Sequence, residues 1–378
     1  MQKDTGASVR IYNIAIGLAK LGHDVTVVLP KLHPTFELIN GVRVRGFSGL
    51  FPKPVLNVLK KFVDIGRPTA LYFYDLLFAL RIIPLLRNSD IIQLEGQTTG
   101  GLLIPLTKIV LKKPIVLDCH DVFQALRLRH VSIFRMMLET FFEKLTYKMA
   151  DLILTVSNVE RDCLVLMGCK GSNITIIPNG VDSRFFEKSS KYCALKRKYH
   201  LEGFRIVVFV GNLAYPPNRE AVTLLSSKIA PIVLDKVKNV KFLVVGKKPQ
   251  DLQATDLLFT GFVDNVSDVL SISDVGVAPL LHGSGTRLKI LEYFSCSLPV
   301  VSTSIGAEGL EIEDGVNIFI ENNLERFAFR IIQLLTDPNL SKDIGAAARI
   351  LATTTYDWTC ILQKLEVNLQ NFLLKNCS

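Results

Sequence analysis

The stretch from Val275 to Val301, VGVAPLLHGSGTRLKILEYFSCSLPVV, is the most informative part of this sequence about its fold. A short apolar run is followed by a break at Gly283 and Gly285, by apolar residues at helical spacing, and by a second apolar run from Leu298. Short apolar runs are typical of buried strands, and two parallel strands need a crossover connection, usually a helix. The stretch therefore predicts a strand, a glycine loop, a helix and a second strand, which is the βαβ unit of a parallel sheet.

The glycine loop of this unit has features of an anion site. Glycines let the backbone approach a ligand, and the start of a helix offers free N–H groups and the positive end of its dipole. Arg287 adds a cation, and Lys289 and Glu292 lie three residues apart on one helix face. We expect a diphosphate at the loop and a hydroxyl-rich group near Glu292. The alternative is a simple turn followed by a solvated Lys–Glu pair, because short motifs often match by chance.

Length and composition bound the class of protein. A chain of 378 residues predicts two domains, and 49% hydrophobic with 21% charged residues is typical of globular proteins. The net charge of +9 favours anionic partners such as phosphorylated small molecules or anionic lipid. Nothing resembles a nucleic-acid-binding motif, so we expect no nucleic-acid partner. The seven cysteines form no CxxC pair, which predicts reduced thiols and no metal site.

Strand and helix patterns alternate along the chain in two successive series. The expected strands are 25–29, 42–47 (small and exposed), 90–94, 114–117, 152–156, 174–177, 206–210, 240–245, 257–260, 275–280, 298–301 and 318–320. The expected helices are 6–21, 55–86 (broken near 66–68), 102–111, 131–149, a helix capped by Ser157 that ends near 167, 218–236, 324–335, 340–353 and 358–374. This alternation predicts two α/β domains with mainly parallel sheets, which bind ligands at the carboxyl ends of their strands.

Six segments resemble one family, the retaining, nucleotide-sugar-dependent glycosyltransferases of the GT-B fold (glycosyl transferases group 1), which includes sucrose synthase and bacterial mannosyltransferases. They occur in the family's order and span nearly the whole chain. The segments are TGASVRIYNIAIGLAKLGHDVTVV from Thr5, DCHDV from Asp118, ADLILTVSNVERDCL from Ala150, IIPNGVD from Ile176, FVGNLAYPPNREAV from Phe209 and HGSGTRLKILEYFSCSLPVVST from His282.

The resemblance implies two Rossmann-like domains that face each other across a cleft. The N-terminal domain, 1–180, would bind the acceptor, and the C-terminal domain, 181–357, would bind the nucleotide sugar. The last helix, 358–374, would pack back on the N-terminal domain. The sequence begins where the family's first strand has normally ended, so we expect that strand to lie upstream of Met1.

The resemblance also implies roles for single residues. Glu292 matches the glutamate that bonds the ribose, and Arg287 and Lys289 are where we expect the diphosphate contacts. His120 matches the histidine that lies against the transferred sugar, although an arbitrary histidine after a strand is more often a satisfied core residue. Gly6 matches a glycine of the first loop near the phosphates. The other donor-binding positions that we expect are Gly211, Asn212, Gly283, Ser284, Gly285 and Thr286.

Two departures from the family pattern concern the donor site. Many members have a glutamate where this chain has Ser284, and many carry an Arg and a Lys after the strand that opens the second domain. Here that loop reads GNLAYPPNREAV, with Arg219 as its one cation. A branch of the family with a GSGTRLK-type loop shows both changes, so we expect Arg287 and Lys289 to supply the relocated cations. The sugar becomes harder to predict as a result.

These features predict a retaining glycosyltransferase that moves a sugar from a nucleoside-diphosphate sugar to an acceptor hydroxyl. The acceptor would be lipid-linked or a glycan, in the synthesis of a glycolipid, a polysaccharide or another cell-surface glycan. We expect no cofactor and no metal, because fixed cations would take the metal's place. A non-catalytic sugar-nucleotide-binding subunit and a nucleotide-sugar 2-epimerase are the alternatives.

The sequence also bears on location. It has no secretory signal and no apolar run that could span a bilayer, which predicts a cytoplasmic protein. The segments 55–63 and 123–137 mix cations with apolar residues, as surfaces that rest on anionic membranes do. Peripheral attachment to the inner face of the membrane and ordinary core-facing helices are equally open for these segments.

Overall fold

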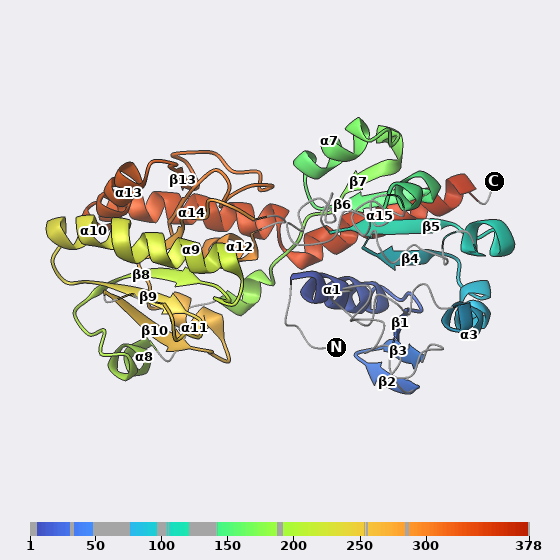
Figure 1. Cartoon of the computed structure of the whole chain (residues 1–378), viewed down its shortest axis with the longest axis horizontal. Coiled ribbons are helices and arrows are strands. Elements are labelled where there is room, and N and C mark those ends of the chain that lie inside the picture. Colours follow the sequence, from blue (N-terminus) through green and yellow to red (C-terminus); the bar gives the residue numbers. More distant parts are fainter. Residues whose placement is uncertain are drawn as a thin grey trace. The chain divides into compact units, whose positions relative to one another are not determined.

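The structure is a computed structural model that describes most of the chain (Figure 1). The described residues are 6–30, 34–47, 76–96, 104, 106–120, 141, 143–186, 192–252, 254, 256–283 and 287–376. The chain divides into two compact units: the N-terminal unit, Met1–Pro178 with Leu362–Ser378, and the C-terminal unit, Asn179–Ile361. Each unit combines helices with mainly parallel strands, which confirms the predicted α/β class.

A six-stranded parallel sheet forms the centre of the C-terminal unit, in the order β10-β9-β8-β11-β12-β13. The strands are β8 (Arg205–Val210), β9 (Val240–Val245), β10 (Leu257–Gly261), β11 (Val275–Ala278), β12 (Val300–Ser302) and β13 (Phe319–Ile320). From β8 the chain moves outward to β9 and β10, and it then returns to β11 on the other side of β8. The winding therefore reverses between β8 and β11, which is where such sheets bind ligands.

Helices cover both faces of this sheet, because its strands are apolar on both sides. In β8, Val207 and Phe209 belong to a core completed by α9, α10 and α13, whereas Ile206 and Val208 belong to a core completed by α11, α12 and α14. Figure 1 shows α9 and α10 lying across the sheet. The helices of this unit are α8 (Tyr192–Lys198), α9 (Pro216–Leu224), α10 (Ala230–Lys236), α11 (Val266–Leu270), α12 (Leu288–Ser295), α13 (Leu324–Thr336) and α14 (Pro338–Thr355).

The described residues of the N-terminal unit form two sheets. A three-stranded sheet has the order β1-β3-β2, and a four-stranded parallel sheet has the order β4-β5-β6-β7. The strands are β1 (Thr26–Pro30), β2 (Thr35–Ile39), β3 (Val42–Phe47), β4 (Ile92–Glu95), β5 (Ile115–Cys119), β6 (Leu152–Thr155) and β7 (Ile174–Ile176). The helices that the structure describes over their full length are α1 (Gly6–Lys20), α3 (Leu76–Arg87), α7 (Asn158–Leu166) and α15 (Trp358–Asn376), of which the larger part belongs to this unit.

Helix α15 packs on helix α1 through Gly17. Gly17 has no side chain, and the side chain of Leu362 occupies the place where a Cβ would lie. Close beyond α1, His23 Nε2 donates to Glu366 Oε1 at 3.2 Å. The last helix of the chain therefore forms part of the N-terminal unit's packing.

The strand 42–47 was expected to be exposed, and that prediction is wrong. Strand β3 lies between β1 and β2, and Val42 and Val44 are buried. The alternation of valine with arginine is typical of a strand with one buried face. The sequence analysis also missed β2, whose Phe36 and Leu38 are exposed.

Two predicted helices have different forms from those expected. The helix expected at 218–236 begins at Pro216 and is interrupted by a π-helical segment, Leu225–Ile229, between α9 and α10. Of the helix expected at 102–111, the residues Leu106–Leu111 are π-helical. The predicted N-cap at Ser157 is confirmed, because Ser157 Oγ accepts a hydrogen bond from the Glu160 N–H at 3.3 Å. The expected helical stretches 55–75 and 131–140 lie outside the described residues.

Among the described residues, no helix has the length and apolar character that crossing a bilayer requires.

Gly276, in strand β11, provides a test of how tightly the C-terminal unit is packed. A Cβ on Gly276 would lie 2.6 Å from Cδ2 of the fully buried Tyr293, whose hydroxyl accepts from the Val210 N–H at 2.8 Å. The ring cannot move aside without disturbing that bond. We expect Gly276→Ala to lower the free energy of unfolding by about 1–3 kcal/mol, measured by urea denaturation.

Gly171→Ala is the matched control for this measurement. A Cβ on Gly171 would meet its nearest atoms at an ordinary 3.8 Å. We expect its effect to stay within about 0.5 kcal/mol. Equal effects of the two substitutions would contradict the packing argument.

Candidate functional site

Two loops meet where the adjacent parallel strands β8 and β11 end. Gly211 follows β8, Gly283 lies in the loop after β11, and α12 begins directly behind that loop. Because the strands run in the same direction, both loops emerge at one edge of the sheet. We call the loop glycines and the polar residues at this edge the switch-point cluster: Gly211, Asn212, Asn218, Gly283, Arg287, Lys289 and Glu292.

Lys289 lies half-buried in the first turn of α12 and is held from two sides. Its Nζ donates to Asn218 Oδ1 at 2.8 Å and lies 4.0 Å from the centroid of the Phe209 ring. Burial, and then repulsion from Arg287, lowers the pKa of Lys289 to about 7, although Glu292 acts in the opposite direction. An anion bound beside this amine would favour its charged form.

Glu292 lies one turn further along α12. Burial raises the pKa of Glu292 to about 7, and Lys289 opposes that rise. The neighbouring Tyr293 accepts a hydrogen bond from the Val210 N–H at 2.8 Å, which fixes this turn of α12 to the end of β8. The carboxylate is therefore presented from a rigid element at the switch point.

Arg287 is the N-cap residue of α12, and its side chain is buried. Its Nε donates to the Ile305 carbonyl at 3.3 Å. The guanidinium lies against Gly283, because a Cβ on Gly283 would be 3.1 Å from Nη1, 3.2 Å from Nη2 and 3.3 Å from the Tyr215 hydroxyl. Gly283 also has a φ of +126°, which only glycine adopts readily. This glycine thus keeps Arg287 and Tyr215 close to the loop.

Gly211 has a packing role that its sequence context does not reveal. A Cβ on Gly211 would lie 2.9 Å from the amide of Asn218, so a side chain here would displace Asn218. Asn218 Nδ2 donates to the Asn212 carbonyl at 3.0 Å, and Asn212 Oδ1 accepts from the Ala214 N–H at 3.0 Å. Gly211 and Asn212 thereby shape the loop around Asn218. Their expected contact with the donor remains a prediction.

A second cluster lies at the carboxyl ends of β4 and β5 in the N-terminal unit. We call Arg10, Glu95, Asp118 and His120 the histidine cluster. His120 Nε2 donates to Glu95 Oε2 at 2.9 Å and lies 3.7 Å from Asp118 Oδ2. Gln93 Nε2 donates to the other Glu95 oxygen at 2.7 Å, which fixes the carboxylate.

The histidine cluster rests on a buried ion pair. Arg10 Nε and Nη2 each donate to a different oxygen of Asp118 at 2.8 Å, and Nη1 donates to the Pro178 carbonyl at 3.1 Å. Arg10 and Asp118 are both fully buried. Burial disfavours the charge of Arg10, but Asp118 outweighs it and raises the pKa of Arg10. Such a bidentate pair is rigid, and losing either partner would leave a buried charge without compensation.

The cluster has a metal-like donor set but does not suit a metal. One ligand atom each from Glu95, Asp118 and His120 lies within 4.8 Å of the others. Both Asp118 oxygens already accept from the Arg10 guanidinium, however, and a bound cation would lie beside that positive charge. We therefore interpret these residues as an ion-pair network that holds His120. Burial opposes the protonation of His120, but Glu95 and Asp118 outweigh it and raise its pKa.

The structure places the predicted site residues in two separate groups. His120 lies in the N-terminal unit, and Gly211, Asn212, Gly283, Arg287, Lys289 and Glu292 share the switch point of the C-terminal unit. Gly6 is the first residue of α1 instead of a loop residue. Ser284, Gly285 and Thr286 lie outside the described residues. The sequence analysis missed the partners Arg10, Glu95, Asp118 and Asn218.

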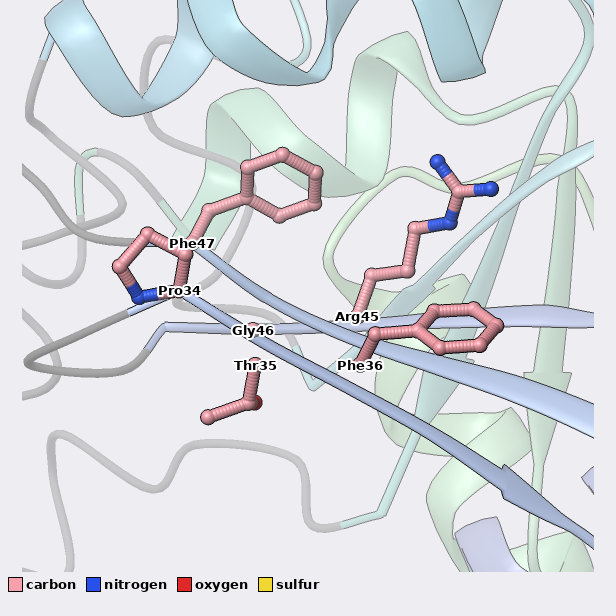
Figure 2. Close-up of a pocket in the computed structure, with 6 residues that line it drawn as sticks. All are labelled: Pro34, Thr35, Phe36, Arg45, Gly46 and Phe47. Atoms are coloured by element: carbon pink, nitrogen blue, oxygen red, sulfur yellow. The ribbon is translucent and has the colours of Figure 1, made fainter.

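A hollow of about 300 Å³ lies elsewhere, on the paired strands β2 and β3. Figure 2 shows its lining, in which the Arg45 guanidinium lies 5.7 Å from the centroid of the Phe36 ring. Its lining residues are Pro34, Thr35, Phe36, Arg45, Gly46 and Phe47. None of them belongs to either cluster, so we place no chemistry in this hollow.

Two family models match this chain. The model described as Glycosyltransferase Family 4 matches residues 5–185, and the model described as Glycosyl transferases group 1 matches residues 204–337. The structure is similar to that of Anabaena HepE in complex with UDP and glucose, at 16% identity, with 98% of this chain and 97% of that chain covered and a TM-score of 0.71. It is also similar to sucrose-phosphate synthase from Thermosynechococcus elongatus, at 16% identity, with 98% and 94% covered and a TM-score of 0.72. These likenesses show the GT-B fold.

Curated relatives match over shorter spans. An uncharacterized 44.6 kDa protein in the cps region of Klebsiella pneumoniae is 28% identical over 164 residues, which cover 40% of this chain and 42% of that protein. The chitobiosyldiphosphodolichol beta-mannosyltransferase of Candida albicans is 24% identical over 310 residues, covering 72% of this chain and 66% of the relative. The chain thus spans less than two thirds of the length of these relatives.

Glu95→Gln tests the charge balance of the histidine cluster. The change keeps the side-chain size but removes the charge that favours protonated His120, so we expect the pKa of His120 to fall. The pKa is measured by NMR titration of the imidazole, with its signal identified by comparison with His120→Gln. An unchanged pKa would show that Glu95 does not control the charge of His120.

The same cluster predicts how stability depends on pH. The folded-state pKa of His120 lies above its ordinary value of about 6.5. Its contribution to stability is therefore fully present below that ordinary value and is lost as the pH rises through the folded-state pKa. We expect the free energy of unfolding of Glu95→Gln, measured by urea denaturation, to fall less between pH 5 and pH 9 than that of the wild type. A loss equal to that of the wild type would contradict the linkage.

Proposed function

Because the chain belongs to the glycosyltransferases, with a Family 4 region followed by a group 1 region, we propose that it transfers a sugar from a nucleoside-diphosphate sugar to an acceptor hydroxyl with retention of configuration. The observation that carries the proposal is the gathering of Arg287, Lys289 and Glu292 at the switch point between β8 and β11. The likeness to the Anabaena structure in complex with UDP and glucose supports a nucleoside diphosphate as the ligand.

In this proposal the diphosphate of the donor binds at the start of α12. Arg287 and Lys289 contact its oxygens, and the N-terminal end of the helix adds its positive dipole. As the bond between sugar and phosphate loosens, negative charge grows on the leaving diphosphate, and these fixed positive groups stabilise it. They do what a divalent cation does in other diphosphate sites, so the reaction as proposed needs no metal.

Glu292 and His120 have separate roles in the proposal. The Glu292 carboxylate accepts hydrogen bonds from the ribose hydroxyls, and those bonds favour its ionised form. His120 donates to a hydroxyl of the transferred sugar, and Glu95 and Asp118, which raise its pKa, favour the protonated form as donor. The acceptor attacks on the face from which the diphosphate departs, as the family resemblance implies for retention.

The acceptor is proposed to be lipid-linked or a glycan, in the synthesis of a cell-surface glycan. A relative named for chitobiosyldiphosphodolichol and another named for a cps region support this choice, as does the net charge of +9. Cytoplasmic location and peripheral contact with an anionic membrane belong to the same proposal. The segments on which the membrane contact would depend, 55–63 and 123–137, lie outside the described residues.

The first experiment measures nucleotide release from UDP-, GDP- and ADP-sugars with a mixed polyprenyl-phosphate and membrane-lipid extract as acceptor. We expect release from one donor, and NMR of the product should show the donor's anomeric configuration. Glu292→Gln should lower kcat/KM about 10- to 100-fold, because a hydrogen bond to a charged group is lost. Glu325→Gln, in the first turn of α13, is the matched control. If the folded protein releases nucleotide from none of these donors, a binding subunit is favoured instead. Release of free 2-epimerised sugar would favour an epimerase.

Donor binding should depend on pH through Lys289. The pKa of Lys289 is about 7, so the free protein loses this charge as the pH rises above that value. We expect the Kd for UDP, measured by calorimetry between pH 6 and pH 9, to rise by up to about tenfold per pH unit above pH 7. Lys289→Arg should flatten the profile, because arginine stays charged. A flat profile in the wild type would remove Lys289 from the diphosphate site.

A further inference from the structure

The loop after β8 has no cation of its own to offer the switch point. Its sequence from Gly211 to Asn218 contains no lysine or arginine. The next residue, Arg219, donates to the Asp251 carboxylate at 2.7 Å, so its guanidinium is already engaged in an ion pair. The cation that reaches the loop instead is Lys289, which comes from α12.

The side chain of Asn218 is oriented by its own hydrogen bond so that its oxygen accepts from Lys289. It lies buried in the first turn of α9, and its Nδ2 donates to the Asn212 carbonyl at 3.0 Å. This bond fixes the amide so that Oδ1 is the atom facing Lys289 Nζ, at 2.8 Å. Gly211 leaves the space that the amide fills, because a Cβ there would lie 2.9 Å from Asn218 Cγ. Gly211 therefore packs against Asn218, and Asn218 in turn holds Lys289.

The partners of Lys289 hold its ammonium group without neutralising it. Asn218 offers a neutral oxygen, and the Phe209 ring offers its negative face at 4.0 Å from the centroid to Nζ. The charged groups that act on Lys289 are Arg287, which repels it, and Glu292, which attracts it. On α9, Arg219 is paired with Asp251, and Glu220 lies 3.9 Å from His282. When Lys289 is protonated, neither of the side chains that hold it neutralises its charge, which is therefore available to an anion.

We propose that Asn218 is a positioning residue, which holds the Lys289 ammonium group over the end of β8 as the replacement for the missing loop cation. The proposal rests on the proposed function for the identity of the anion, a nucleoside diphosphate. This role also explains why position 218 has an asparagine and not an aspartate. An aspartate at position 218 would form an ion pair with Lys289 and compete with the diphosphate for its charge.

Asn218→Asp tests the proposal in the protein without ligand. The change is isosteric and adds one negative charge 2.8 Å from Lys289 Nζ. The pH dependence of Lys289 acetylation by acetic anhydride, followed by mass spectrometry, reports its midpoint of deprotonation. We expect that midpoint to rise by about one to two pH units. Asn323→Asp, which adds the same charge at the N-cap of α13, should leave it unchanged. An unchanged midpoint in Asn218→Asp would overturn the proposal.

Donor binding provides the second readout. We expect Asn218→Asp and Asn218→Ala each to raise the Kd for UDP about tenfold at pH 7, and Asn218→Asp to move the pH dependence of binding towards alkaline pH. A fall in thermal stability with unchanged UDP affinity and unchanged acetylation would show a merely structural role and overturn the proposal.

The two readouts separate the proposals. Failure of the wild type to bind UDP, GDP or ADP would sink the proposed function, whereas the acetylation midpoint would still decide whether Asn218 controls Lys289.

Discussion

Burial of the parallel strands on both faces is the constraint on which the rest of the structure depends. Helices cover both sides of the six-stranded sheet, so the side chains along β8 and β11 are committed to packing. Polar groups that must meet a ligand can then be placed only where strands end. The switch-point cluster at the ends of β8 and β11 follows this rule, and so does the histidine cluster at the ends of β4 and β5.

The two clusters solve the problem of buried charge differently. In the histidine cluster, Arg10 and Asp118 compensate each other fully, and the pair acts as a fixed support. In the switch-point cluster, Lys289 and Glu292 both have a pKa of about 7, and the two side chains that hold the lysine ammonium group, Asn218 and Phe209, are neutral. The ion pair of the histidine cluster gives rigidity. In the switch-point cluster, a bound ligand can change the protonation of Lys289 and Glu292.

The sequence was sufficient for the fold class, because buried parallel strands are short apolar runs with glycine or polar residues after them. The sequence did not reveal β2, because its apolar residues Phe36 and Leu38 are exposed and do not mark a buried face. It also failed at β3, because alternating valine and arginine was interpreted as exposure. The π-helical segment Leu225–Ile229 leaves the helical pattern of α9 and α10 almost unchanged, so it could not be seen.

The candidate site was predictable at the residues that share one short stretch, such as Arg287, Lys289 and Glu292. Their partners come from distant parts of the chain: Arg10 and Asp118 are 108 residues apart, and Asn218 and Lys289 are 71 apart. One feature of the sequence did indicate a buried ion pair. Asp118 interrupts an otherwise apolar strand, and a buried charge requires a partner. No local pattern could name Arg10 as that partner.

The discontinuity of the N-terminal unit has a consequence for the nascent chain. Residues from Leu362 onward belong to this unit, and Leu362 fills the space beside Gly17. A ribosome makes that segment only after every residue of Asn179–Ile361 has been made. The N-terminal unit therefore cannot complete its packing until the whole C-terminal unit has been synthesised, and until then Leu362 does not cover the Gly17 face of α1.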